Sequence, residues 1–411
     1  MNVKWYRDND LIEEQDYTVD DANYFCDTQV QAYNKIVITI NNMTRANRFL
    51  KVFNIDDGIT RTFYNDELEN ADIIEEITEN NQAININEAQ LIILPKTNTG
   101  VLFQRTLPFG IYRNGVLIGK YFVDTSTSNT DKTIYKLKLS DYISMLNGQT
   151  YLGGQYNNVT VATLIADILG DIPYELDQTL GARTITGYLG IMNKREALRE
   201  VAFCTNAIVD TSRVEKIVIK PLPTTVSEIV GEDRIIDIES TQQNIITTYT
   251  LNTSILTSTT TSADDLFSGA ISGTQMVVFD SPHYNLTISS GGTIVSSNIN
   301  YAIISGNGNV TLKGKAYTEV VNSQSKDNPY AVSSDLEKVE TFETSLTCNE
   351  IDILDELEFI EFKIKSTFMM EDIKVGDLIT LNGKECRVMT LEYTLEQTNI
   401  YAVAELEAYY E

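Results

Sequence analysis

The sequence has very few of the residues that enzymes and metal sites most often use. It contains a single histidine, His283, and four widely spaced cysteines, Cys26, Cys204, Cys348 and Cys386. One histidine cannot supply a multi-histidine metal site, and no C-x-x-C pair is present to begin a tetrahedral zinc set. We therefore predict four reduced structural thiols, no metal site and no cofactor.

No catalytic set is expected around His283 either. Asp280 and Ser281 are close to it in sequence, but neighbouring residues on a strand point to alternate faces and do not converge as a triad must. We interpret His283 as a polar turn residue, and we interpret Asp56-Asp57-Gly58 and Gly306-Asn307-Gly308-Asn309 as hairpin turns rather than calcium or phosphate loops. The 58 acidic residues provide no carboxylate pair that stands out as catalytic. The sequence thus predicts no catalytic residues and no enzyme.

Positive charge is also scarce. Lys and Arg number 31 against 58 Asp and Glu, which gives a net charge of −27. Such a surface repels nucleic acid, so we expect no specific nucleic-acid binding. There is no apolar run of about 18 residues that could span a membrane. We therefore expect no membrane insertion. The N-terminus has no Sec-type apolar core, so we expect the chain to be made and folded in a reducing cytoplasm.

The patterns that are present predict a mainly β protein with a small α/β part. Alternating apolar and polar residues mark short strands on both sides of two helical patterns. Residues 253–272 are rich in Ser and Thr, which is typical of a loop or linker. The predicted domains are a first β-barrel at residues 1–150, an α/β connector at 151–225, and a second β-barrel at 226–411 with a Ser/Thr-rich β-hairpin insertion at about 252–320.

Local signals are clearest between residues 107 and 205. Asn114-Gly115 lies between apolar alternations and predicts a tight hairpin. Thr160 and Gly170 bracket an apolar stripe of helical period as its cap and its stop, and Asn193 caps a second helix.

These segments, in this order, resemble one protein family. The strand 115–124, the segment 135–146 that contains Asp141 and Tyr142, the Y-x-G-G-x-Y motif at 151–156 and the following helix resemble the tail-hub (baseplate hub) proteins of bacteriophages and phage-derived contractile particles. Residues 191–209 resemble that family's helix before a buried strand. The Val-Gly-Asp turn at Gly376 and Asp377 resembles the turn that opens the last strands of its second barrel.

The resemblance implies a structural role and no enzymatic activity. It implies two tail-tube-like barrels flanking a connector in a homotrimeric ring, which adapts a six-fold tail tube to a three-fold central spike. The implied partners are the tail-tube protein, the central spike protein, the tape-measure protein and other baseplate proteins, in the tail baseplate of a phage or a bacteriocin-type (tailocin) particle. The implied structural motif residues are Asn114, Gly115, Asp141, Tyr142, Gly376 and Asp377.

Two alternatives belong to other classes. The 22 tyrosines and the Ser/Thr-rich insertion permit a carbohydrate-binding or host-adhesion tail protein, because aromatic rings stack on sugars. Tyr284, Tyr301 and Tyr317 fall on predicted strands, where cross-strand packing is the more common use of an aromatic residue. A cell-wall hydrolase is the third alternative, and it lacks a recognisable catalytic set.

Overall fold

The computed structural model describes residues 1–7, 9–19, 30, 33–40, 62–78, 80, 82–96, 107–242, 245–258, 262–289, 291–332, 337–370, 372–395 and 400–410. The chain divides into two compact units, Met1–Tyr64 and Asn65–Glu411. In the first unit, β1 (Asn2–Arg7) lies between β2 (Asp10–Asp16) and β3 (Lys35–Thr39) in an antiparallel sheet. The strand expected at residue 35 is thus present, but it pairs with β1 rather than with the strands after residue 65. The strands expected at 49–55 and 59–64 and the turn at 56–58 lie almost wholly outside the described residues.

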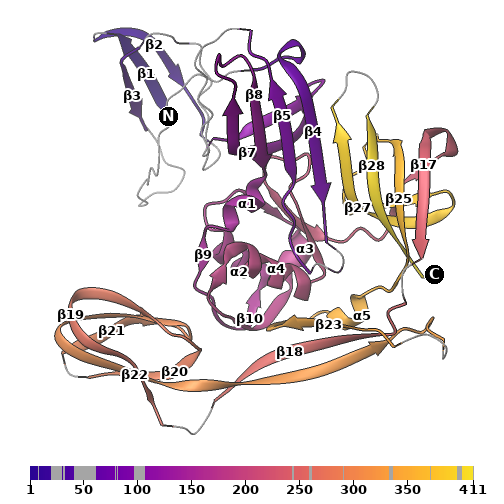
Figure 1. The fold of residues 1–411 in the computed structure, drawn as a ribbon. Coiled ribbons are helices and arrows are strands. Elements are labelled where there is room, and N and C mark those ends of the chain that lie inside the picture. The colour runs from indigo at the N-terminus through magenta and orange to yellow at the C-terminus, as the bar shows by residue number, and fades with distance from the viewer. Residues whose placement is uncertain are drawn as a thin grey trace. The chain divides into compact units, whose positions relative to one another are not determined.

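The second unit is built on one large sheet of 11 strands, which two groups of strands form together (Figure 1). The first group is β4 (Leu68–Glu76), β5 (Glu88–Ile93), β8 (Tyr135–Ser140), β7 (Val116–Ser128) and β6 (Phe109–Arg113), in that order. The second group is β17 (Ile235–Gln242), β25 (Ile360–Met369), β28 (Tyr401–Tyr409) and β27 (Lys384–Thr394), with β26 (Leu378–Leu381) beside β27 and β16 (Val226–Val230) beside β26.

The strand β27 joins the two groups. One of its edges pairs with β28, while its other edge pairs first with β26 and then, at residues 390–394, with β4. The two predicted β domains therefore share one hydrogen-bonded sheet. Closure of each group into a separate barrel stays a prediction.

Alternation of side chains explains why these segments form strands with one buried face. In β8, the apolar residues Tyr135, Leu137 and Leu139 are buried, whereas Lys136 and Lys138 between them are exposed. The hairpin between β6 and β7 turns at Asn114 and Gly115, whose φ angles are +50° and +81°. Two successive positive φ values are what a tight two-residue hairpin turn requires.

The connector is the α/β part of the structure, at residues 142–221 (Figure 1). It contains four helices and several short strands, and its hydrophobic core around α2 and α4 also includes Ile84, Phe122 of β7 and Leu346. The helices are α1 (Tyr142–Leu146), α2 (Val161–Leu169), α3 (Gln178–Ala182) and α4 (Lys194–Cys204). The strands are β9 (Thr150–Tyr151), β10 (Gly154–Thr160), β11 (Tyr174–Leu176), β12 (Thr184–Leu189), β13 (Met192–Asn193), β14 (Ala207–Asp210) and β15 (Ile217–Pro221).

The predicted helix boundaries of the connector are confirmed. The Thr160 hydroxyl accepts a hydrogen bond from the Thr163 N–H at the start of α2, and Gly170 ends that helix with φ +63°. Asn193 accepts from the Glu196 N–H and caps α4. Caps of this kind satisfy N–H groups that a helix leaves unpaired at its first turn.

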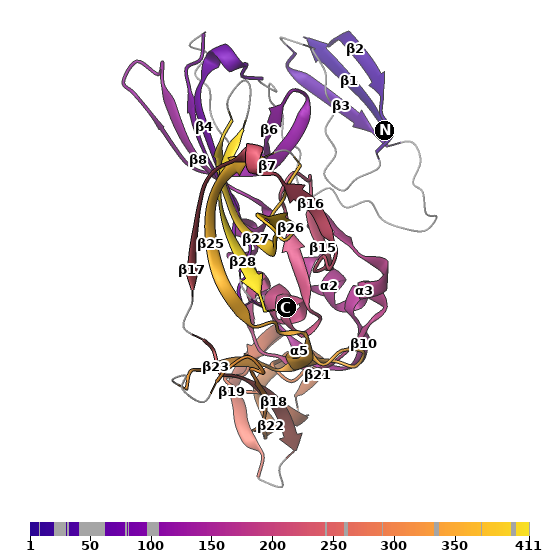
Figure 2. The same cartoon turned by 90° about the vertical axis from the view of Figure 1, so that its right-hand side faces the viewer.

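The insertion is longer and more regular than the sequence indicates. It runs from β18 (Thr248–Ser258) through β19 (Asp264–Val278), β20 (His283–Ile288), β21 (Gly292–Ser297) and the 27-residue β22 (Tyr301–Asp327) to β23 (Val339–Thr344). Between the insertion and β25, the chain forms β24 (Leu346–Cys348) and α5 (Ile353–Glu356). Figure 2 shows β18, β22 and β19 together on the side of the connector away from the large sheet.

Two predictions inside the insertion are wrong. Residues 253–272 are mostly strand rather than linker, because β-branched threonine fits a pleated sheet as well as it fits a loop. Residues 306–309 are not a turn: they lie within β22, which pairs with β19 on one edge and with β21 on the other. Glycine is needed at 306 because a Cβ there would lie 2.3 Å from the carbonyl oxygen of Gly291, the residue before β21.

The structure confirms a mainly β fold with an α/β connector. Strand pairing marks no domain boundary at residue 150 or 225, because strands before and after the connector belong to one sheet. These two boundaries stay a prediction.

Candidate functional site: the junction between the strand groups and the connector

Asp141 holds the start of the connector against the first strand group. Its carboxylate caps α1 by accepting from the Ile143 N–H at 2.9 Å, and it also accepts from the Asn87 N–H at 3.0 Å. The Thr211 hydroxyl, which follows β14, donates to the same carboxylate. The Asn87 side-chain amide donates to the hydroxyls of Thr211 and Ser212. One buried carboxylate therefore connects β5, α1 and the β14–β15 loop.

Burial raises the pKa of Asp141 from its usual 3.8 to about 6, against the opposing effect of the hydrogen bond from Thr211 and those from the backbone. The side chain is almost wholly removed from water, and an ionised carboxyl loses solvation there. Tyr142, the next residue, packs edge-on against Phe122 of β7 with ring centroids 4.9 Å apart. Asp141 and Tyr142 thus lie in the core of the junction.

A second buried network joins the two strand groups to the connector. Tyr393 of β27 donates a hydrogen bond of 2.8 Å to Glu75 of β4, and Arg213 of the β14–β15 loop lies 3.6 Å from the other carboxylate oxygen. Glu75 is fully buried, and its Oε2 atom has no hydrogen-bond partner. Burial raises the pKa of Glu75, and the Arg213 charge opposes this rise. No local pattern in the sequence marks these residues, because Glu75 and Tyr393 are 318 positions apart.

The Val-Gly-Asp turn lies against the connector. Gly376 has a φ of +84°, and the Asp377 carboxylate accepts from the Lys374 N–H at 2.9 Å. A Cβ on Gly376 would lie 2.8 Å from Cδ1 of Ile208 in β14. Arg387 of β27 donates to the Gly376 carbonyl at 3.1 Å. The turn thus combines a left-handed backbone with a close approach to the connector.

The six motif residues divide into two places. Asp141, Tyr142, Gly376 and Asp377 lie around the connector where the strand groups meet it. Asn114 and Gly115 lie at a hairpin tip, where the flanking Tyr112 and Val116 side chains are 57% and 65% exposed.

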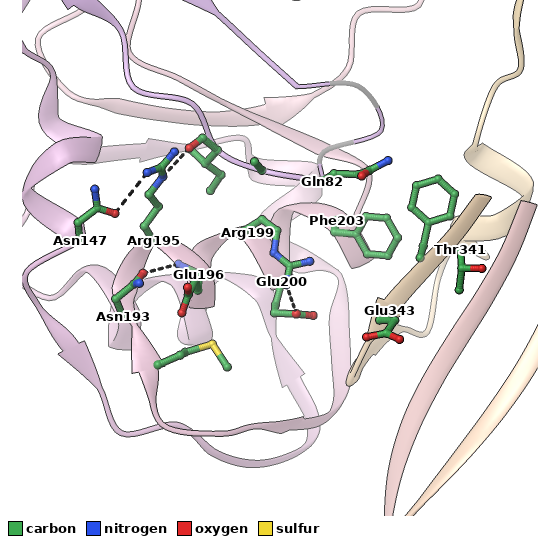
Figure 3. A pocket seen from close by; sticks show the side chains of 14 residues that line it. Gln82, Asn147, Asn193, Arg195, Glu196, Arg199, Glu200, Phe203, Thr341 and Glu343 are labelled. Atoms are coloured by element: carbon green, nitrogen blue, oxygen red, sulfur yellow. Dashed lines mark hydrogen bonds and ion pairs between the residues drawn. The ribbon is translucent and has the colours of Figure 1, made fainter. Parts of the chain in front are cut away.

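A cavity of about 640 Å³ opens beside α4, between the connector and β23 (Figure 3). Arg195 donates to the Ile84 carbonyl and to Asn147, and Arg199 pairs with Glu200, so both guanidinium groups are engaged. The rings of Phe203 and Phe342 stack at its wall with centroids 5.8 Å apart. The described lining residues include no histidine, cysteine, lysine or tyrosine, and their carboxylates are those of Glu196, Glu200 and Glu343.

The remaining reactive groups are held in structural contacts. His283 is not a turn residue as predicted: it is a buried residue that begins β20, because an edge contact with Phe279 and pairing with Ala316 hold it in the insertion. Its Nδ1 atom lies 2.7 Å from the Ser281 backbone oxygen, and its Nε2 atom lies 3.5 Å from Asp264, so the Ser281 hydroxyl is not its partner. Tyr284 and Tyr317 pack on each other with centroids 4.6 Å apart. In the described part of the chain, no group of three His, Cys, Asp or Glu side chains could hold a metal ion.

Cys204, Cys348 and Cys386 are buried free thiols, and Cys26 lies outside the described residues. No helix among the described residues is long and apolar enough to cross a membrane.

Solved structures of tail proteins are similar to this chain. The 43 kDa tail protein of prophage MuSo2 from Shewanella oneidensis has a TM-score of 0.48 and 9% identity, over 82% of this chain and 93% of that one. A tail protein from Neisseria meningitidis has a TM-score of 0.49 and 11% identity, over 84% of this chain and 93% of that one. Prophage tail protein gp18 from Listeria monocytogenes has a TM-score of 0.46 and 8% identity, over 82% and 89%.

No known family profile and no curated protein sequence matches the chain. Two of these structures are described as prophage tail proteins and the other as a tail protein.

Removing Arg213 tests the network at Glu75. We expect Arg213→Met to lower the free energy of unfolding by about 3–5 kcal/mol, because it leaves the Glu75 carboxylate buried without its counter-charge. The double variant Glu75→Leu/Arg213→Met should recover much of this loss. Lys216→Met is the control, since Lys216 and Glu175 form an exposed pair and its loss should cost about 1 kcal/mol or less. Chemical denaturation measures all three, and equal losses in Arg213→Met and Lys216→Met would contradict a buried network.

The raised pKa of Asp141 predicts that the free energy of unfolding falls as the pH rises. A carboxyl whose pKa is higher in the folded than in the unfolded protein contributes stability below pH 4, and this contribution is lost as the pH rises towards 6. The loss is about 3 kcal/mol for a rise of this size. Asp141→Asn should remove this loss from the pH profile of the unfolding free energy. The control is Asp177→Asn. Asp177 is an exposed helix cap, and its hydrogen bond with Thr179 lowers its pKa, so this variant should keep the decline. Burial also raises the pKa of Glu75, so a smaller decline should remain in Asp141→Asn. A decline of unchanged size would contradict the assignment.

Gly376→Val tests the turn. We expect a loss of about 1–3 kcal/mol from the left-handed backbone alone, and a larger total because the new side chain collides with Ile208. The control is Gly383→Val, because Gly383 has a φ of +80° and nothing within 4 Å of an added Cβ. If both variants lose the same free energy in thermal unfolding, the contact of this turn with the connector is not important.

Proposed function

We propose that the chain is the structural baseplate hub of a phage or phage-like contractile tail. Three copies would form a ring that adapts a six-fold tail tube to a three-fold central spike, without enzymatic activity. The observation that carries the proposal is the single sheet in which β27 unites two groups of strands. One chain then offers two strand groups to a ring, and three chains offer six.

The rigidity of the junction supports this role. An adaptor has to hold its two strand groups in one arrangement, because each must meet one subunit of the tube. Main-chain pairing between β4 and β27 fixes their register, and the Glu75–Arg213–Tyr393 network ties both to the connector. Two groups on a flexible linker would not keep a fixed angle between them.

The edge strand β17 supports assembly with another protein surface. Among the described residues it pairs only with β25, and seven of its eight residues are exposed, including Ile236 at 63% and Ile238 at 39%. Exposed strand edges with apolar residues favour pairing with a further chain, and soluble proteins usually protect them. We infer that a neighbouring subunit of the ring covers β17.

The charge of the chain suits a channel that does not retain nucleic acid. With a net charge of −27 per copy, a ring of copies repels a passing phosphate backbone. The partners in this proposal are the tail-tube, central spike, tape-measure and other baseplate proteins, and the place of action is the tail baseplate of the particle.

The ring predicts a defined mass. Native mass spectrometry of the purified chain should give the mass of a trimer. The double variant Ile236→Lys/Ile238→Lys should shift it to monomer by placing charge on the edge that a neighbour covers.

The control is Val321→Lys, which adds a lysine at an exposed β-branched residue of the insertion, away from β17, and should leave the trimer intact. A monomeric wild-type chain would contradict the ring. A trimer that survives the double variant would instead place the interface away from β17.

A further inference from the structure

The distal part of the insertion, residues 262–316, is a small folded body with its own core. This part is called the tip here. Ile271, Val277, Ala302, Ile304 and Leu312 belong to a hydrophobic cluster that contains no residue of the connector. The tip is connected to the rest of the chain by a two-stranded ribbon, in which residues 254–258 of β18 pair with 317–321 of β22 (Figure 1). The core of the tip is thus formed by residues of the tip itself.

Two asparagines of the β21–β22 turn attach the tip to the connector. The Asn300 side-chain amide donates to the carbonyls of Leu152 and Leu189, each at 2.8 Å. The Asn298 amide donates to the Gly153 carbonyl at 2.8 Å. Asn300 is 3% exposed, so its amide is almost fully withdrawn from water at this contact.

A further polar contact and an open cavity lie beside the asparagine contacts. Tyr317, at the base of the tip, donates to Gln155 of β10 over 3.4 Å. An open cavity of about 400 Å³ lies between Gln155 and the tip residues His283, Tyr284 and Asn298. Side chains in a permanent interface are normally close-packed, as they are in a protein core.

A separate contact holds the ribbon. Tyr188 of β12 lies near Ser254 and Glu319 of the ribbon, and burial, together with the nearby Glu319 charge, raises the pKa of Tyr188 to about 12. This contact lies on the ribbon between the tip and the body of the chain. It fixes the near end of the ribbon, so that motion of the tip would begin beyond it.

We propose that the insertion is a latched arm, in which the Asn298–Asn300 turn holds the tip on the connector and can release it while the core of the tip stays folded. Three neutral amide–carbonyl hydrogen bonds exchange readily for bonds to water, so each contributes little net free energy. A body with its own core moves as one piece when such a contact opens. This inference does not depend on the proposed hub role.

The test uses isosteric variants in the full chain. Asn298→Asp retains the side-chain oxygen that accepts from the Asn300 and Tyr301 N–H groups, so the turn keeps its shape, but it removes the donor to Gly153. Asn300→Asp removes the donor to Leu152 and Leu189 and places a carboxylate against their carbonyls. Asn307→Asp is the matched control, because Asn307 lies exposed on β22, within the tip.

Spin labels on Ala166→Cys of α2 and Gln275→Cys of β19, both exposed positions, report the distance between connector and tip, with Cys26 replaced by serine. Double electron–electron resonance should give one narrow distance in the parent and in Asn307→Asp. In Asn298→Asp/Asn300→Asp, at least about half of the molecules should move to a broad distribution at other distances. Hydrogen exchange of residues 302–312 should stay within about twofold of the parent.

Two results would overturn the proposal. An unchanged distance distribution in the double variant would show that the asparagine contacts do not hold the tip. Loss of protection at residues 302–312 together with the distance change would show that the tip unfolds when it is detached, so that tip and connector are one folding unit.

Discussion

The pairing of β27 with β4 is the constraint on which the rest of the second unit depends. Residues 390–394 pair with 72–76, and the ladder is extended at both ends by hydrogen bonds from Ile77 to Met389 and from Leu395 to Ala71. Without the pairing of β27 with β4, the two strand groups would be two separate sheets. With it, strands from both ends of a 347-residue unit form one surface, and the connector is held beneath by buried polar groups.

Burying a charged group costs free energy unless hydrogen bonds and opposite charges replace its contacts with water. Asp141 satisfies its oxygens with a helix cap, a backbone N–H and a hydroxyl. Glu75 has a single hydrogen bond and a longer ion pair, so it is the less stabilised of the two. A buried charge that one partner balances makes the structure sensitive to the loss of that partner. The buried Glu75 carboxylate also specifies that β4, β27 and the β14–β15 loop meet at this point.

The sequence predicted what short-range chemistry determines. Asn114-Gly115 requires two positive φ angles, Thr160 and Asn193 cap helices through bonds to residues three positions away, and Gly376 has the left-handed backbone that its motif suggests. Pairings over long separations could not be predicted, because a ladder between residues 74 and 392 leaves no local mark. Ser/Thr-rich strands in the insertion were mistaken for linker, since composition alone does not separate the two. The contacts of Asn298 and Asn300 were missed for the same reason as Glu75: their partners lie more than 100 residues away.

The central claim is that one chain places two strand groups in a closed three-fold ring. Electron cryo-microscopy of the purified protein tests it most directly. We expect class averages of a ring with three-fold symmetry and six strand groups around one channel, with β17 covered by the neighbouring copy. Single chains with an uncovered β17, or a ring of any other symmetry, would contradict it.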